Sequence, residues 1–182
     1  MGDIVTMDDL TNQEIVAVLD DAERLVPVAR GDVYLPLLQG KVLANMFFEN
    51  STRTRMSFET AMKRLGGSVL NFTSIGTSVA KGETLYDTMQ MIDGYADVAA
   101  IRHPRQGAAQ YSADAVEIPI LNAGDGAGNH PTQTMLDLFT IRQAHGTLEG
   151  LNVVLVGDLR YGRTVHSCLL YTSDAADEKV RG

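Results

Sequence analysis

Apolar residues occur along the chain in short runs that alternate with stretches of helical spacing. The short runs predict buried strands, at residues 41–48, 68–72, 98–101, 118–121 and 151–156. A capping-box pattern at Thr11–Glu14 and helical spacing elsewhere predict helices, over 11–25, 52–65, 84–95 and 131–144, with another beginning near Gly162. Strands that alternate with helices predict an α/β fold built on a doubly wound parallel sheet.

Composition narrows the class of protein. The 182 residues suit one domain, or one domain and a further fragment. A net charge of −8 argues against general binding of nucleic acid or of an anionic membrane. No apolar run approaches the roughly 20 residues of a membrane span, and the first residues lack the pattern of a secretion signal. The single cysteine, Cys168, excludes an internal disulfide, and we expect a cytoplasmic protein.

Polar segments follow the predicted strands where a parallel sheet binds its ligands. These segments cover residues 49–55, 102–105, 122–133 and 157–163. The run Ser51–Arg55 opens a helix and offers backbone N–H groups, hydroxyls and arginines, which is chemistry suited to a phosphate. Composition alone supports equally a capped helix start with solvated arginines.

Four further segments carry candidate chemistry, each with a plain structural alternative. A loop bearing Ser78 and Lys81 could bring an ammonium group over an anion, although a loop lysine is usually solvated. Arg102 follows a strand and could simply end it, while His130 could simply cap the next helix. The segment 157–164 lacks the G-x-G-x-x-G spacing of a dinucleotide site, and its Arg163 suits a carboxylate or a surface position.

Taken together and in order, these segments resemble the aspartate carbamoyltransferase family. The matching motifs are FFENSTRTRMSFE (47–59), KGET (81–84), IRHP (101–104), LNAGDG (121–126), NHPTQT (129–134) and VGDLRYGRTVHS (156–167). The resemblance runs from about residue 6 to Ser167. It implies transfer of the carbamoyl group of carbamoyl phosphate to the amine of L-aspartate, an early step of pyrimidine synthesis. It also implies no metal or organic cofactor and a homotrimer with shared active sites, and it leaves the presence of regulatory subunits open.

The resemblance assigns a role to individual residues. The phosphate group is expected to lie against Ser51, Thr52, Arg53 and Thr54. The carbamoyl carbonyl is expected to be held and polarised by Thr54, Arg102 and His130, and the carbamoyl amide to be bound by Gln133. The catalytic set is thus Arg53, Thr54, Arg102 and His130. Residues that reach into a neighbouring subunit's site are expected to be Ser78 and Lys81, and those that help hold aspartate Arg163 and Thr164.

The resemblance also divides the chain. It implies a carbamoyl-phosphate-binding domain over 1–134, an interdomain helix over 135–149 and the start of a second α/β domain, which binds aspartate, over 150–167. Residues 168–182 depart from the family and resemble a translated sequencing adapter. We therefore expect a non-native tail and a fragment without turnover of its own.

Two other functions compete with this interpretation. Ornithine carbamoyltransferases share the STRTR element but typically carry HPCQ where this chain has Thr132, and they lack the lysine that stands here as Lys81. A carbamoyl-phosphate-binding module without turnover belongs to a different class. Turnover with aspartate separates both from the main interpretation.

Overall fold

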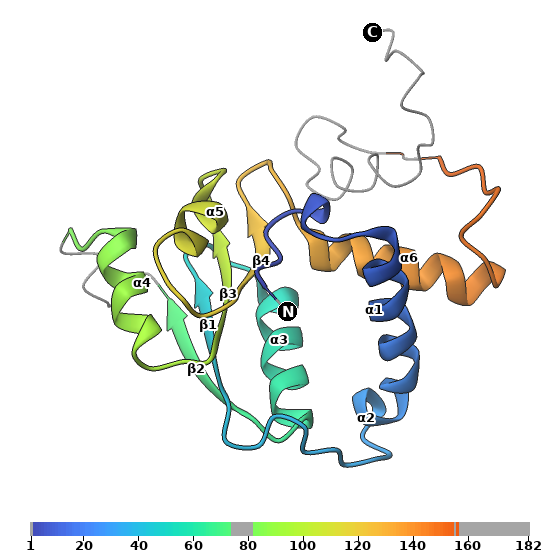
Figure 1. Cartoon of the computed structure of the whole chain (residues 1–182), viewed down its shortest axis with the longest axis horizontal. Coiled ribbons are helices and arrows are strands. Elements are labelled where there is room, and N and C mark those ends of the chain that lie inside the picture. The colour runs from blue at the N-terminus through green and yellow to red at the C-terminus, as the bar shows by residue number, and fades with distance from the viewer. Residues whose placement is uncertain (1, 74–81, 155, 157–182) are drawn as a thin grey trace, which may run out of the picture.

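Four parallel strands form the centre of the molecule (Figure 1). The computed structural model describes residues 2–73, 82–154 and 156. The strands are β1 (Val42–Phe47), β2 (Ser68–Thr73), β3 (Val98–His103) and β4 (Ile120–Asp125), and they lie in the order β2-β1-β3-β4. The N-terminal segment continues the parallel pairing, because Ile4 donates its N–H to the Ile120 carbonyl at 2.8 Å.

Helices cover both faces of this sheet. They are η1 (Met7–Asp9), α1 (Asn12–Arg24), α2 (Val26–Arg30), α3 (Thr52–Arg64), α4 (Leu85–Asp93), α5 (Ala108–Ala113) and α6 (Pro131–His145). Figure 1 shows α4 and α5 on one side of the sheet, with α3, α1 and α6 on the other. The predicted doubly wound parallel fold is confirmed.

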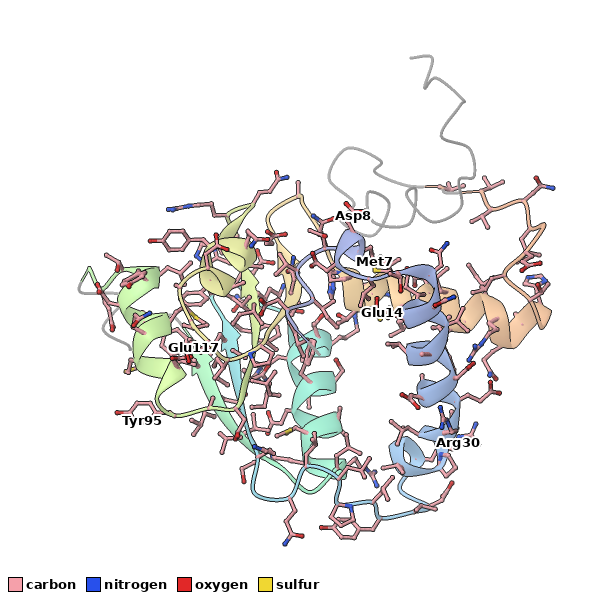
Figure 2. All side chains as sticks on the ribbon, in the orientation of Figure 1. Met7, Asp8, Glu14, Arg30, Tyr95 and Glu117 are labelled. Atoms are coloured by element: carbon pink, nitrogen blue, oxygen red, sulfur yellow. The ribbon has the colours of Figure 1, made fainter. Side chains whose placement is uncertain are left out.

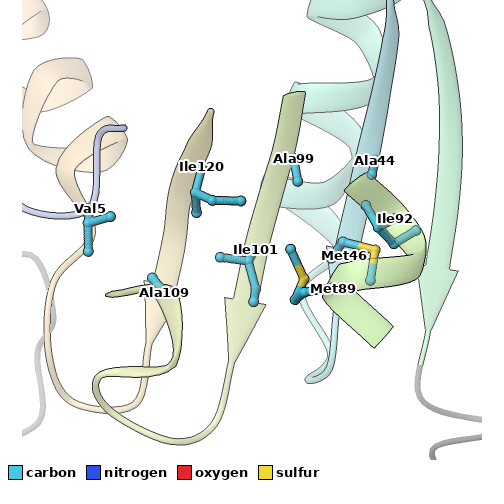
Figure 3. Close-up of a cluster of buried hydrophobic side chains, with 9 residues drawn as sticks. All are labelled: Val5, Ala44, Met46, Met89, Ile92, Ala99, Ile101, Ala109 and Ile120. Atoms are coloured by element: carbon cyan, nitrogen blue, oxygen red, sulfur yellow. The ribbon is translucent and has the colours of Figure 1, made fainter. Parts of the chain in front are cut away.

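The core follows from the alternation of side chains along the strands. Figure 3 shows Ala44 and Met46 of β1, with Ile101 of β3, packed against Met89 and Ile92 of α4. The intervening residues point to the opposite face, where Leu43 and Ala100 pack with Met62 of α3. Each central strand is therefore buried on both faces, which explains why the strands read as continuous apolar runs.

A reciprocal cap begins α1, as the Thr11–Glu14 pattern predicts. The Glu14 N–H donates to the Thr11 hydroxyl at 3.3 Å, and the Thr11 N–H donates to the Glu14 carboxylate at 2.8 Å. The Thr11 N–H, and secondarily the Thr11 hydroxyl, which also donates to the Glu14 carboxylate at 2.7 Å, lower the pKa of Glu14. Figure 2 shows Glu14 on the first turn of α1, close to Met7 and Asp8 of η1.

Several elements differ from the predictions. Helices α2 and α5 were not predicted, because five or six residues are too short to display helical periodicity. Strand β4 begins two residues later than predicted and continues through Asp125, so 122–125 belong to the strand and not to the loop after it. The predicted buried strand over 151–156 is wrong for residues 151–154 and 156, which form no strand, with Val154 81% exposed. No described strand lies beside them to supply hydrogen bonds.

Among the described residues, none of the helices combines the length and the apolar character that crossing a membrane would need. The predicted helix near Gly162 and the tail 168–182 lie outside the described part of the chain.

Candidate anion-binding site

A cleft of about 1330 Å³ opens at the carboxyl ends of β1, β3 and β4. Three segments form its walls: α3 as far as Ala61 with the residues before it, the end of β3 with Pro104, and the turn into α6 with the first residues of that helix. The cleft is lined by Asn50, Ser51, Thr52, Arg53, Thr54, Ser57, Phe58, Ala61, Arg102, Pro104, Gly126, Ala127, His130, Thr132, Gln133 and Leu136. Ala61 of α3 is exposed where it lines the cleft.

The N-terminus of α3 is built differently from those of α1 and α4. The side chains of Thr11 and Thr84 cap α1 and α4, and each of those helices carries an acidic residue in its first turn. Ser51, at the start of α3, makes no such capping bond, and the first turn of α3 holds no acidic residue. The N–H groups and the positive end of this helix dipole therefore face the cleft beside Arg53, with no acidic residue in the first turn of the helix itself.

A chain of two side-chain amides, which starts at a buried asparagine of β1, holds this turn against the sheet. Asn45 of β1 is fully buried, and its Nδ2 donates to the Arg55 carbonyl and to the Asn71 Oδ1, each at 3.1 Å. The Asn71 Nδ2 donates in turn to the Glu59 carboxylate at 3.0 Å. Hydrogen bonds from Lys63 and then Asn71 lower the pKa of Glu59. The first turn of α3 is thus fixed to β1 and β2 by side chains that sequence reasoning did not single out.

Arg102 reaches the cleft from the end of β3. Its Nε donates to the Glu49 carboxylate at 2.7 Å, and its Nη1 donates to the Ala123 carbonyl at 3.1 Å. The side chain is only 15% exposed. These contacts fix the direction of the guanidinium group, because a bonded planar fork has few remaining orientations.

The adjacent His103 has a different environment. It does not line the cleft; its ring packs on Phe48 with centroids 5.0 Å apart, and its Nδ1 accepts from the Arg105 N–H at 3.0 Å. Burial, and secondarily the charge of Arg105, lower the pKa of His103. Of this motif, only the arginine and the proline face the cleft.

His130 occupies the position that begins α6, and it is 7% exposed. Its carbonyl accepts from the N–H groups of Gln133 at 3.0 Å and of Thr134 at 3.2 Å. Its Nδ1 lies 3.3 Å from the Thr132 hydroxyl. His130 is therefore fixed to the first turn of α6 through its backbone and its ring, and it lines the cleft.

The buried carboxylate of Asp125 shapes the turn that leads to His130. One oxygen accepts from the Gly107 N–H at 2.8 Å, and the other accepts from the Asn129 N–H at 3.0 Å and the Asn122 Nδ2 at 3.2 Å. Gly128 must remain a glycine here, since a Cβ would lie 2.9 Å from the Asp125 carboxylate. Asp125 belongs to the LNAGDG motif (121–126), but the resemblance assigns it no role, and the sequence marks it only by its place between two glycines.

The structure brings most of the predicted site residues together. Those that line this cleft are Ser51, Thr52, Arg53, Thr54, Arg102, His130 and Gln133. Ser78, Lys81, Arg163 and Thr164 lie outside the described residues. Within the described ranges, no group of three or more His, Cys, Asp or Glu side chains is placed to hold a metal ion.

The fold and the cleft define an α/β domain that can receive an anion at the carboxyl edge of its sheet. Residues 2–143 match the family described as aspartate/ornithine carbamoyltransferase, carbamoyl-P binding domain. The chain belongs to this family.

Curated relatives and solved structures narrow the similarity. The chain is 53% identical over 170 residues to the aspartate carbamoyltransferase catalytic subunit of Archaeoglobus fulgidus, covering 93% of this chain and 57% of the relative. The Methanocaldococcus jannaschii catalytic subunit is 51% identical over 168 residues, covering 92% of this chain and 55% of that relative. The chain thus spans little more than half the length of these relatives.

Solved structures agree with the sequence comparison. The Trypanosoma cruzi aspartate transcarbamoylase in complex with carbamoyl aspartate and phosphate superposes with a TM-score of 0.89 at 44% identity, over 93% of this chain and 55% of that one. The catalytic subunit of M. jannaschii aspartate transcarbamoylase gives a TM-score of 0.86 at 50% identity, over 93% and 56%.

Proposed function

We propose that this chain is the carbamoyl-phosphate-binding part of an aspartate carbamoyltransferase. The observation that carries the proposal is the convergence on one cleft of the uncapped start of α3, Arg53, Arg102, His130 and Gln133. These groups suit the phosphate, carbonyl and amide parts of carbamoyl phosphate, and in an acidic chain they are a local concentration of positive charge.

Each part of the ligand has matching groups. The phosphate lies at the start of α3, where Ser51, Thr52 and Thr54 supply donors and Arg53 supplies charge. Arg53 also stabilises the charge that grows on phosphate as it leaves. The carbonyl oxygen accepts hydrogen bonds from Thr54, Arg102 and His130, and the carbamoyl NH₂ donates to Gln133.

The reaction is an acyl transfer through a tetrahedral intermediate. The aspartate amine attacks the carbonyl carbon, and negative charge develops on the carbonyl oxygen. The bond from that carbon to the phosphate oxygen then breaks, and the proton lost by the amine passes to the departing phosphate. Each donor placed on the developing oxyanion lowers the barrier by about 3 kcal/mol, and holding both substrates in contact supplies much of the rest.

Aspartate is favoured over ornithine as the acceptor. The relatives quoted above bear the name aspartate carbamoyltransferase, and Thr132 stands where ornithine enzymes typically carry cysteine. The aspartate groups on this chain would include Arg163 and Thr164. The enzyme would act in pyrimidine biosynthesis in the cytoplasm.

The proposed assembly is a homotrimer in which Ser78 and Lys81 of one copy complete the site of its neighbour. A regulatory subunit is a further proposed partner, since the relatives are described as catalytic subunits. The proposed division of the chain is a carbamoyl-phosphate-binding domain over 1–134, an interdomain helix over 135–149 and the start of the aspartate-binding domain over 150–167.

The test uses a chimera, because the chain spans 57% of the Archaeoglobus relative. Residues 1–167 are joined to the remaining half of that relative, and circular dichroism verifies folding. We expect carbamoyl aspartate from carbamoyl phosphate and aspartate, and no citrulline from ornithine. His130→Ala should lower kcat about 100-fold. Citrulline formation, or an unchanged kcat in His130→Ala, would contradict the proposal.

A further inference from the structure

Gln133 is held at the cleft wall by a partner that does not itself line the cleft. Its Nε2 donates to the Asp137 Oδ1 at 3.0 Å. The two residues lie four positions apart on α6, so their side chains lie on the same face of the helix. Both are half-buried, and only Gln133 borders the cleft.

This contact decides which end of the Gln133 amide the cleft receives. A carboxylate accepts hydrogen bonds and cannot donate them, so the NH₂ end of the amide must face Asp137. The carbonyl Oε1 is then the end available toward the cleft. An acceptor at this place suits an NH₂ group and leaves a methyl group unmatched.

We propose that Asp137 is a positioning residue that makes the site selective for a carbamoyl group. Its carboxylate fixes the Gln133 amide with Oε1 toward the ligand, which favours carbamoyl phosphate over an acyl phosphate with methyl in place of NH₂. This inference rests on the proposed function, since it takes Gln133 as the group that meets the carbamoyl NH₂.

The same spacing occurs elsewhere without a cleft. At the end of α5, the Gln110 Nε2 donates at 2.9 Å to the Oδ1 of Asp114, the residue that follows the helix, and both residues are exposed. That pair shows what a glutamine and an aspartate at this spacing do on an ordinary helix surface. Asp114 therefore provides a matched control for the removal of Asp137.

Replacing the acceptor with a donor should reverse the amide. Asp137→Lys replaces the carboxylate beside Gln133 with an ammonium group, which can donate but not accept. The Gln133 amide should then turn its Oε1 toward the lysine and its Nε2 toward the cleft. The added charge acts equally on carbamoyl phosphate and acetyl phosphate. The ratio of their affinities therefore reports amide orientation, and inorganic phosphate reports the anion site itself.

The experiment is calorimetric titration of inorganic phosphate, carbamoyl phosphate and acetyl phosphate into the 182-residue chain and its variants. In Asp137→Lys the preference for carbamoyl over acetyl phosphate should fall about tenfold, while inorganic phosphate still binds. Asp137→Asn, which can either donate or accept, should give a smaller fall. Asp114→Lys should leave the preference unchanged.

A double variant distinguishes positioning from a general structural role. In Gln133→Glu with Asp137→Lys, one carboxylate oxygen pairs with the lysine and the other accepts from the carbamoyl NH₂, so the preference should return. An unchanged preference in Asp137→Lys would overturn the inference. So would a result in which Asp137→Lys loses binding of all three ligands and the double variant does not restore it. If the parent chain is folded and binds none of the ligands, the proposed function fails, and this inference fails with it.

Discussion

Removing the carboxylate of Asp125, at the end of β4, should destabilise the domain much more than removing that of an exposed aspartate. Asp125 is 4% exposed and receives hydrogen bonds from Gly107, Asn129 and Asn122. Two of the donors are backbone N–H groups from the loops after β3 and after β4. Asp125→Ala removes this acceptor from two half-buried backbone N–H groups and from the buried Asn122 amide, which keeps its other bond to the Val5 carbonyl at 2.9 Å.

The magnitude follows from the hydrogen bonds lost. A bond to a charged acceptor contributes about 1.5–3 kcal/mol, and a buried donor without a partner costs about 1–3 kcal/mol. Water that enters the space of the missing carboxylate offsets part of this cost. We therefore expect Asp125→Ala to lower the free energy of unfolding by about 4 kcal/mol, against a total of roughly 5–15 kcal/mol for a domain.

Urea unfolding followed by circular dichroism measures this loss. Asp114→Ala is the control, because Asp114 is exposed and accepts from one side chain, Gln110. It should change the free energy of unfolding by no more than about 0.5 kcal/mol. Asp125→Asn keeps one acceptor oxygen and should fall between the two. A loss below about 1 kcal/mol in Asp125→Ala would refute the role given to this carboxylate.

Three further predictions concern single positions outside the cleft. Gly66 and Gly40 both have a positive φ, but a Cβ at Gly66 would lie 2.9 Å from Pro36, while a Cβ at Gly40 would have no atom within 4 Å. In chemical denaturation, Gly40→Ala should lower the free energy of unfolding by about 1 kcal/mol, and Gly66→Ala should lower it by more. Equal losses in the two variants would contradict this. Burial lowers the pKa of His103 below 6.5 in the folded chain. Between that lowered pKa and pH 6.5 the unfolded chain binds more protons at this residue, so the free energy of unfolding should fall as the pH decreases through this range. An NMR titration of His103 with a midpoint at or above pH 6.5 would contradict this prediction. Thr11→Ala should cost about 1 kcal/mol through loss of the helix cap, and thermal unfolding with an unchanged midpoint would argue against that cap.

Local patterns were sufficient to predict elements that are long or buried on both faces. Strand β1 could be found because Leu43, Met46 and Phe47 lie in one apolar run, and both faces of that strand are covered. Helix α6 could be found because Pro131 begins it and Gly146, with a positive φ, ends it. Helix α5 carries its contacts on Ala108, Ala109 and Ser112 within six residues, too few for a period to show.

The strand predicted over 151–156 shows the limit of this reasoning. Its apolar residues satisfy the pattern of a buried strand, but a strand also needs a neighbour to pair with. The pattern of apolar residues shows which side chains a segment can bury, but it does not show whether another strand lies beside that segment.

The site divides in the same way. Residues that face the ligand, such as Arg53 and His130, stand in motifs that sequence reasoning could recognise. Residues that hold them in place act across long separations, as Asn45 does through Asn71 and Asp125 does through Gly107. Only the register of the sheet and the path of the loops bring such pairs together, so no single-chain pattern could have predicted them.

The most direct test of the account is binding of carbamoyl phosphate to the 182-residue chain, measured by calorimetry beside two arginine variants. Arg53 and Arg55 lie on the same turn of α3, and of the two only Arg53 lines the cleft. The account predicts saturable binding that Arg53→Ala abolishes and that Arg55→Ala largely retains. An equal loss of affinity in both variants would mean that the net charge of the chain, and not the position of Arg53, determines binding. If the folded parent chain does not bind carbamoyl phosphate, the anion site itself is contradicted.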